Sequence, residues 1–242
     1  MYQGVNAFIE TYKSPFDKIG KATKKAKKAI SERGERSSKE LLAQEIQLVL
    51  AQWAEKTNKG TKAHDFVHSR ELTKNPNIIL GHYEKYEGTE PLDAEAINKL
   101  EIGKEYHEKQ VVSNLHHLIG YVDAIKVDKK GYINIEDYKS WETVYRSSSW
   151  VMENGFKIPP KYFFAPIDHL DDCNLVHATL QLSIYMYILW TYNKKLKPGT
   201  LKVRHLQLND EGDVINEYFI DVPYLREEVK SLLRNKKMIA GG

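Results

Sequence analysis

The chain has 242 residues, of which 41% are hydrophobic, and this is enough to bury the core of one domain with decorations. The single cysteine, Cys173, excludes a disulfide framework and any cluster held by four thiolates, and it is typical of a reducing, cytoplasmic setting. A formal net charge of +3 does not by itself indicate a polyanionic partner, and no run approaches the roughly 18 apolar residues of a membrane span.

The first predicted helix covers residues 16–33, which are rich in alanine and lysine and contain no proline, and Gly34 is expected to end it. Basic residues gather in and just after this segment, at Lys18, Lys21, Lys24, Lys25, Lys27, Lys28, Arg33 and Arg36. Such a cluster is typical either of a solvated helix face or of a surface that contacts phosphates.

A second helix is predicted to begin after Ser37 or Ser38, because apolar residues then recur every three or four positions up to Trp53. Asn58 and Gly60 predict its end. Thr61 is expected to cap a third helix that carries the apolar and histidine residues Ala63, His64, Val67 and His68.

The middle of the chain changes from a helical to a strand pattern. Residues 91–108 are predicted to be helical, with core residues Ala94, Ile97, Leu100 and Ile102. Residues 111–112, 118–127 and 132–138 are rich in β-branched and aromatic residues, which indicates a strand followed by a hairpin with its turn at 128–131.

The last third alternates again between loop, helix and strand. A loop is expected over 155–166, and the apolar run 172–190 predicts a central buried helix. Residues 202–208 alternate like a strand, and 223–235 have the pattern of an amphipathic closing helix.

Two aspartates and a lysine in the predicted hairpin carry the clearest chemical signal. Asp123 lies in the first strand and Asp137 near the end of the second, so neighbouring strands can bring both carboxylates to one metal. Lys139 follows Asp137 by two residues and therefore shares its face of the sheet. An Asp-x-Lys triplet is more often a solvated face, but these charges lie among apolar residues, where a buried carboxylate requires a metal or a cation.

Three motifs resemble one enzyme group, the PD-(D/E)XK nuclease superfamily. Asp123 followed by Glu136-Asp137-Tyr138-Lys139-Ser140 is most similar to its RecB-type exonuclease branch. Gly60-Thr61-Lys62-Ala63-His64 resembles the Gly-Thr-x-x-His element of that branch, and Gln181-Leu182-Ser183-Ile184-Tyr185 resembles its Gln-x-x-x-Tyr element. Val5-Asn6-Ala7-Phe8-Ile9 is also similar to the opening of phage and mitochondrial-genome-maintenance-type exonucleases, with Asn6 where Ser or Thr is usual.

The resemblance implies an α/β fold with a restriction-endonuclease-like core, in which helices flank a mixed central sheet. It implies a single nuclease domain over residues 1–242, with an N-terminal helical part at 1–59 and a catalytic core at 60–235. The implied reaction is hydrolysis of DNA with Mg²⁺ or Mn²⁺, at single-stranded or free ends, in phage or bacterial replication, recombination or repair. Proteins of those pathways would be further partners.

The resemblance also assigns roles at the metal site. Asp123, Asp137, His64 and the carbonyl of Tyr138 would hold the metal, and Lys139 would position the attacking water. With Cys173 as the only cysteine, the iron–sulfur cluster of some related nucleases is excluded.

Further residues are expected to bind substrate. Gln181 and Tyr185, four residues apart on one helix face, would hold the strand, and Lys24 and Lys28 would contact its phosphates. Glu108, before the strand at 111–112, is an additional candidate acid or an ordinary helix-end charge.

Three other interpretations stay open from the sequence. The same fold can serve as a catalytically idle nucleic-acid-binding module, or as a site-specific endonuclease. His64 and His68, one helical turn apart, can also form half of a zinc site, although no convincing third ligand follows them.

Overall fold

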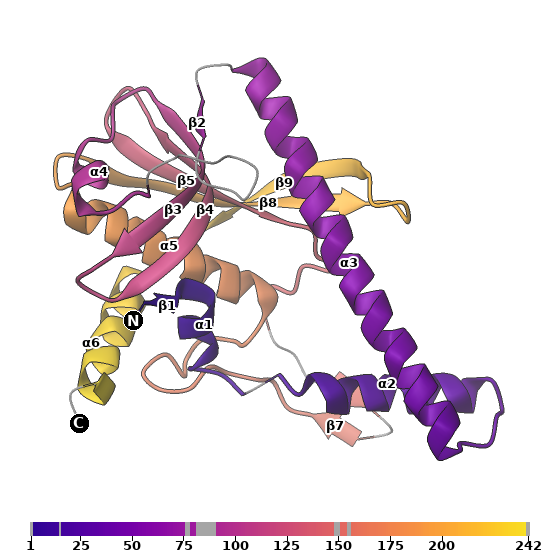
Figure 1. Ribbon diagram of the computed structural model, residues 1–242. Coiled ribbons are helices and arrows are strands. Elements are labelled where there is room, and N and C mark those ends of the chain that lie inside the picture. Colours follow the sequence, from indigo (N-terminus) through magenta and orange to yellow (C-terminus); the bar gives the residue numbers. More distant parts are fainter. Residues whose placement is uncertain are drawn as a thin grey trace.

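The computed structural model describes residues 2–14, 16–75, 78–80, 91–147, 151–153 and 156–240. It shows an α/β fold in which helices flank a mixed sheet (Figure 1). The α/β class and the mixed central sheet expected from the sequence are thereby confirmed.

The large sheet has the strand order β2-β3-β4-β5-β8-β9, and β1 pairs with β4 beside this path. Its strands are β1 (Gln3–Gly4), β2 (Ile79–Leu80), β3 (Glu105–Ser113), β4 (Leu118–Val127), β5 (Tyr132–Lys139), β8 (Lys197–Leu208) and β9 (Val214–Val222). β3, β4 and β5 are antiparallel neighbours, while β5 and β8 are parallel. The predicted hairpin is therefore the centre of the sheet.

The turn between β4 and β5 forms as its residues predict. The carboxylate of Asp128 accepts hydrogen bonds from the backbone N–H groups of Lys130 and Tyr132, and Gly131 takes a positive φ of 79°. The turn fixes the β4–β5 register, which in turn brings Asp123 level with Asp137.

Helix α5 (Asn174–Tyr192) covers one face of the sheet and makes the crossover between the parallel strands β5 and β8. Its residues from Leu180 to Leu189 are almost all buried in the main core, together with Ile125, Ile133 and Val203 of the strands. Helices α1 (Val5–Glu10), α4 (Ala94–Asn98) and α6 (Arg226–Ala240) pack around it. The predicted central helix is confirmed.

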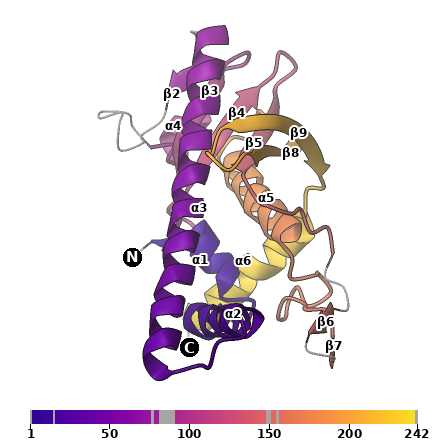
Figure 2. The same ribbon diagram turned by 90° about the vertical axis from the view of Figure 1, so that its right-hand side faces the viewer.

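Helix α3 (Lys39–Lys74) lies on the opposite side of the sheet from α5 (Figure 2). Its residues Ala63 and Val67 form a second, small core with Ala124, Tyr138 and Leu206 of the sheet. The other half of α3 packs against α2 (Lys18–Glu32) in a helical hairpin. As predicted, Gly34 follows α2 with a positive φ of 71°, and Ser38 caps α3.

The predicted break at Asn58 and Gly60 is wrong, because α3 continues through both as one helix of 36 residues. A glycine inside a helix costs only about 1 kcal/mol, which packing can offset. Thr61 does not cap a new helix, since its hydroxyl donates to the carbonyl of Thr57 one turn earlier. The boundary expected at residues 59 and 60 thus falls inside a continuous element.

The helix predicted over 91–108 is also wrong over most of its length. Only α4 is helical, and Asp93 caps it through hydrogen bonds from two backbone N–H groups. Gly103 then takes a positive φ of 82°, and β3 begins at Glu105. Ile97 and Leu100 are buried as expected, but Ile102 is 60% exposed.

Two small features differ from the expected loops. β6 (Val151–Glu153) and β7 (Phe156–Ile158) form a separate two-stranded sheet, and β7 lies inside the loop predicted over 155–166. β9 was not expected as a strand.

Among the described residues, no helix combines the length and the apolar composition that crossing a bilayer requires.

Candidate functional site

Three carboxylates lie in a row across β3, β4 and β5. The β3–β4 register places Glu108 opposite Asp123. The β4–β5 pairing ends at Ala124 and Glu136, one residue before Asp123 and Asp137, so these two aspartates face each other where the strands part. Adjacent strands lie about 4.8 Å apart, so each of the three acids is next to the following one along this row.

Asp123 occupies the gap between the parting strands. Its Oδ2 accepts a hydrogen bond from the backbone N–H of Tyr138, and the residue is only 8% exposed. Burial raises the pKa of Asp123, and the charge of Glu108 adds to this rise, while His64 and Lys139 act in the opposite direction. A cation at this position would relieve the cost of the buried charge.

Asp137 and Lys139 form a buried ion pair on the same sheet face. Lys139 Nζ donates to Asp137 Oδ1 at 2.9 Å and lies 2.7 Å from Oδ2. Burial nevertheless raises the pKa of Asp137 to about 6, with Lys139 lowering it and Asp123 raising it. For Lys139, burial lowers the pKa, but the charges of both aspartates outweigh burial and the net direction is upward.

His64 approaches this row from α3, on the other side of the strands. Ligand atoms of His64, Glu108 and Asp123 all lie within 4.8 Å of one another. The His64 ring also packs edge-on against the ring of Tyr138, with centroids 5.6 Å apart. Gly60 makes the approach close, since a Cβ there would lie 2.7 Å from Ser140 Oγ.

Glu108 is held by a buried chain of histidines and a second glutamate. His68 Nε2 lies 2.6 Å from Glu108 Oε1, and His68 Nδ1 lies 3.3 Å from His107 Nδ1. His107 Nε2 in turn lies 2.9 Å from Glu105 Oε1. Glu108 itself has a positive φ of 49°, a conformation that costs a non-glycine residue on the order of 1 kcal/mol or more. This network orients the Glu108 carboxylate toward Asp123 despite that cost.

The two residues of the expected Gln-x-x-x-Tyr element lie side by side on α5, and their side chains interact with each other. Gln181 Oε1 lies 3.4 Å from Lys139 Nζ and so contacts the site directly. Tyr185 is 2% exposed, and a Cβ at Gly120 would lie 2.3 Å from its hydroxyl oxygen, so the ring is wedged against β4. Tyr185 is thus buried beside the site, where its hydroxyl interacts with Gln181, and its expected contact with a DNA strand stays a prediction.

The expected phosphate-binding residues Lys24 and Lys28 are exposed on α2, at the far end of the α2–α3 hairpin from the sheet and its carboxylates (Figure 1). Lys28 pairs with Glu32 at 3.7 Å, on a surface where such pairs contribute little. A role for these lysines requires an extended ligand that reaches both α2 and the carboxylates.

The donor set suits a divalent cation that prefers oxygen. Asp137 Oδ2 is buried and, among the described residues, no group donates a well-aligned hydrogen bond to it. Glu108 and Asp123 supply further carboxylate oxygens, and His64 supplies one nitrogen. Carboxylates of this kind bind Mg²⁺ and Mn²⁺, and an added imidazole is compatible with Mn²⁺. The Tyr138 carbonyl stays a predicted ligand.

Sequence reasoning missed the supporting residues His107 and Glu105, and it gave His68 a different role. His68 lies one helical turn after His64, which indicated a shared face but not its partner. That partner comes from β3, and its identity depends on the β3–α3 packing rather than on any local motif.

No family model matches this chain, and no curated protein matches it. A comparison with solved structures finds the crystal structure of SSO0001, at 12% identity and a TM-score of 0.29, covering 97% of this chain and 84% of that one. At this level the likeness supports no argument about fold or function.

Proposed function

We propose that this chain is a metal-dependent DNA nuclease with a restriction-endonuclease-like core of the RecB type. One observation carries the proposal: Glu108, Asp123 and Asp137 from three strands meet beside Lys139 and His64. The residues are far apart in the sequence, and burying three acids together is costly unless a cation and a substrate use them.

Each residue has a defined task in this proposal. Asp123, Asp137 and Glu108 would hold Mg²⁺ with His64 beside them, and the ion would neutralise charge on the phosphate and make a bound water more acidic. Lys139, kept protonated by the aspartates, orients the water and stabilises the negative charge that develops on the phosphate. Gln181 holds Lys139 in place through its amide oxygen.

Access to the site is consistent with an extended substrate. A hollow of about 310 Å³ opens onto His64, Tyr138 and Lys139. The lysines of α2 can contact a polyanion that extends beyond this hollow, which predicts salt-sensitive binding.

The experiment that tests this function uses the wild-type chain and end-labelled DNA, with Mg²⁺, with Mn²⁺ or with a chelator. We expect degradation of linear DNA that depends on the metal, and little cutting of closed circular DNA, as for an exonuclease acting at free ends. Cutting of circles would instead favour the endonuclease. Tight DNA binding without any metal-dependent cutting would contradict the nuclease proposal and favour an idle binding module.

A further inference from the structure

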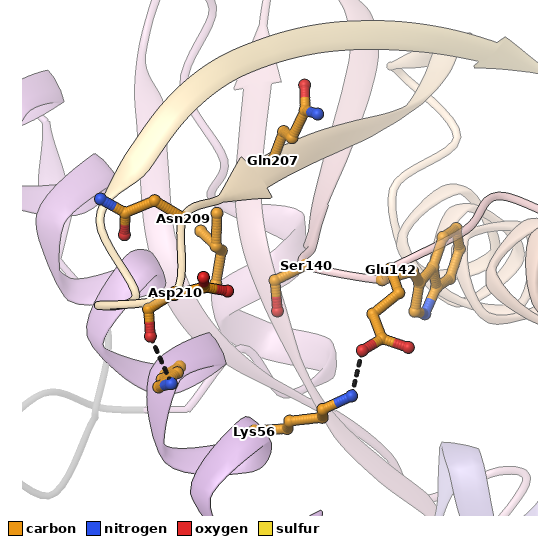
Figure 3. Close-up of a pocket in the computed structure, with 9 residues that line it drawn as sticks. Lys56, Ser140, Glu142, Gln207, Asn209 and Asp210 are labelled. Carbon is orange, nitrogen blue, oxygen red and sulfur yellow. Dashed lines mark hydrogen bonds and ion pairs between the residues drawn. The ribbon is translucent and has the colours of Figure 1, made fainter.

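A groove runs from the candidate metal site along α3 toward the β8–β9 turn. It contains a cavity of about 320 Å³, whose walls include Lys56, Ser140, Trp141 and Gln207 (Figure 3). The hollow beside His64 and Lys139 shares Lys56, Ser140 and Trp141 with this cavity. The two hollows therefore lie next to each other, and we call them together the Trp141 groove.

Both walls of the groove are fixed by close packing. Gly60 lets α3 approach Ser140, as described above, and Gly212 in the β8–β9 turn lies against the side chain of Lys59. Lys59 Nζ also donates a hydrogen bond to the backbone carbonyl of Asp210. The backbone of Trp141 is held by His205, whose Nε2 lies 2.8 Å from the Trp141 carbonyl oxygen. The groove is thus preformed, as binding sites usually are.

The groove carries a lysine whose ion-pair partner can be replaced by a phosphate of a ligand. Lys56 pairs with Glu142 across the opening (Figure 3), and the two side chains are 53% and 77% exposed. Exposed pairs of this kind contribute little to stability, so a phosphate can replace Glu142 on Lys56. Lys25 of α2 also acts electrostatically on Glu142, which places a further cation at this edge.

Trp141 gives the path an aromatic surface beside these cations. It directly follows Ser140 at the end of β5, is partly buried, and lines both hollows. Alternating aromatic and cationic groups along a groove are the features that bind single-stranded nucleic acid, since bases stack on rings and phosphates pair with lysines. The amide of Gln207 adds a group that can contact a base edge or a sugar.

We propose that the Trp141 groove holds the nucleotides of a single DNA strand next to the phosphate at the metal site, with a base stacked on Trp141 and a phosphate on Lys56. This inference rests on the proposed function, because the DNA strand in the groove enters or leaves through the candidate active site. It adds a substrate site that is separate from the carboxylates.

The test measures binding of a fluorescein-labelled single-stranded oligonucleotide to the full chain in a chelator, where no cutting occurs. Trp141→Leu is expected to weaken binding by roughly fivefold or more, the effect of removing one stacked base. Trp141→Phe keeps an aromatic face and should retain most of the affinity. Trp190→Phe, on α5 outside the groove, is the matched control and should bind like the wild type.

The ion pair provides a second, independent comparison. Lys56→Ala and Glu142→Ala remove the same salt bridge, so a purely structural role predicts the same effect for both. The proposal predicts opposite effects, with weaker binding for Lys56→Ala and equal or tighter binding for Glu142→Ala. Parallel weakening in both variants would overturn the assignment of Lys56 to a phosphate.

The remaining outcomes separate this inference from the proposed function. Unchanged binding by Trp141→Leu would overturn the groove, even if the wild type cuts DNA. Trp141-dependent binding by a chain that never cuts DNA would support the groove and reject the nuclease. Tighter binding of duplex DNA or of RNA than of single-stranded DNA would overturn the proposed ligand.

Discussion

Glu108 combines a buried carboxylate with a left-handed backbone conformation. Contacts of the carboxylate with neighbouring side chains offset the free-energy cost of this arrangement. One oxygen faces His68, and a ligand atom of Glu108 lies within 4.8 Å of His64 and Asp123. Backbone strain of this kind gathers at functional sites, where the surroundings hold it in place. At the residue scale, the site therefore depends as much on His68 and His107 as on the expected ligands.

His68 is expected to tune metal binding without touching the metal. Because partners of this kind orient a ligating carboxylate, His68→Leu should weaken Mg²⁺ affinity by roughly 10- to 100-fold. His68→Gln keeps a donor for Glu108 and should lose less. Calorimetric titration of Mg²⁺ measures both, with thermal melting as the check on folding, and equal affinity in all three proteins would contradict the role.

Asp137 predicts a pH dependence of stability in the metal-free chain. Its pKa of about 6 in the folded state is above the ordinary value of 3.8, so the folded state favours the protonated carboxyl. The stability that this group contributes is fully present below the unfolded pKa and is lost as the pH rises through about 6. Urea unfolding in a chelator should therefore show a larger loss of unfolding free energy between about pH 4 and about pH 6 for the wild type than for Asp137→Asn.

The control for this comparison is Asp221→Asn, since the Asp221 side chain is 80% exposed on β9. Its pH dependence should match that of the wild type. Identical curves for the wild type and Asp137→Asn would show that burial of Asp137 does not raise its pKa.

At the element scale, α3 carries His64 to the strands, and Gly60 sets how closely it can pack. A Gly60→Ala change would favour the helix by about 1 kcal/mol if nothing else changed. Its Cβ would, however, lie 2.7 Å from Ser140 Oγ, so either the Ser140 hydroxyl must rotate away or α3 must shift at the turn that precedes His64. The sequence suggested a helix break at this glycine, whereas the structure uses the missing side chain for close packing.

Gly60→Ala is therefore expected to lower both the melting temperature and the affinity for Mg²⁺. The double variant Gly60→Ala with Ser140→Ala should recover both, because the next contact of the new Cβ lies at 4.0 Å. Ser140→Ala alone completes a double-mutant cycle with the wild type, Gly60→Ala and the double variant. Additive losses in the double variant would show that the two residues do not meet as described.

Local sequence patterns predicted those helices and strands whose burial follows the pattern. They failed where contacts with residues distant in the sequence determine the structure. The β4–β5 hairpin, its turn and α5 follow from alternation, Asp128 and an apolar run. β9 has mostly exposed or half-exposed residues at the sheet edge, so its alternation is weak. The pairing of Asp123 with Asp137 was predictable from the hairpin, but the position of Glu108 opposite Asp123 depends on the β3–β4 register and on an unusual φ.

At the scale of the whole molecule, the basic helix α2 lies away from the carboxylates and packs against the other half of α3. Lys24 and Lys28 can contact phosphates of a strand that continues beyond the Trp141 groove. For single-stranded DNA, each phosphate that a lysine neutralises adds about 0.7 to the slope of log affinity against log salt. The double variant Lys24→Gln with Lys28→Gln should therefore reduce the slope by about 1.4.

Lys129→Gln with Lys130→Gln is the matched control. It removes the same charge from the β4–β5 turn, at the end of this β-hairpin that lies away from Asp123 and Asp137. Binding of a labelled single strand at several salt concentrations measures both slopes. Equal slopes for the two double variants would mean that α2 contributes only net charge.

The central claim is that the row of carboxylates and Lys139 hydrolyse DNA, and it is tested most directly by comparing Asp137→Asn and Lys139→Ala with Asp221→Asn on end-labelled linear DNA in Mg²⁺. We predict that the first two lose cutting by roughly 100-fold or more while retaining the fold, and that Asp221→Asn cuts like the wild type. Metal-dependent cutting at the wild-type rate by Asp137→Asn and Lys139→Ala would contradict the proposed site.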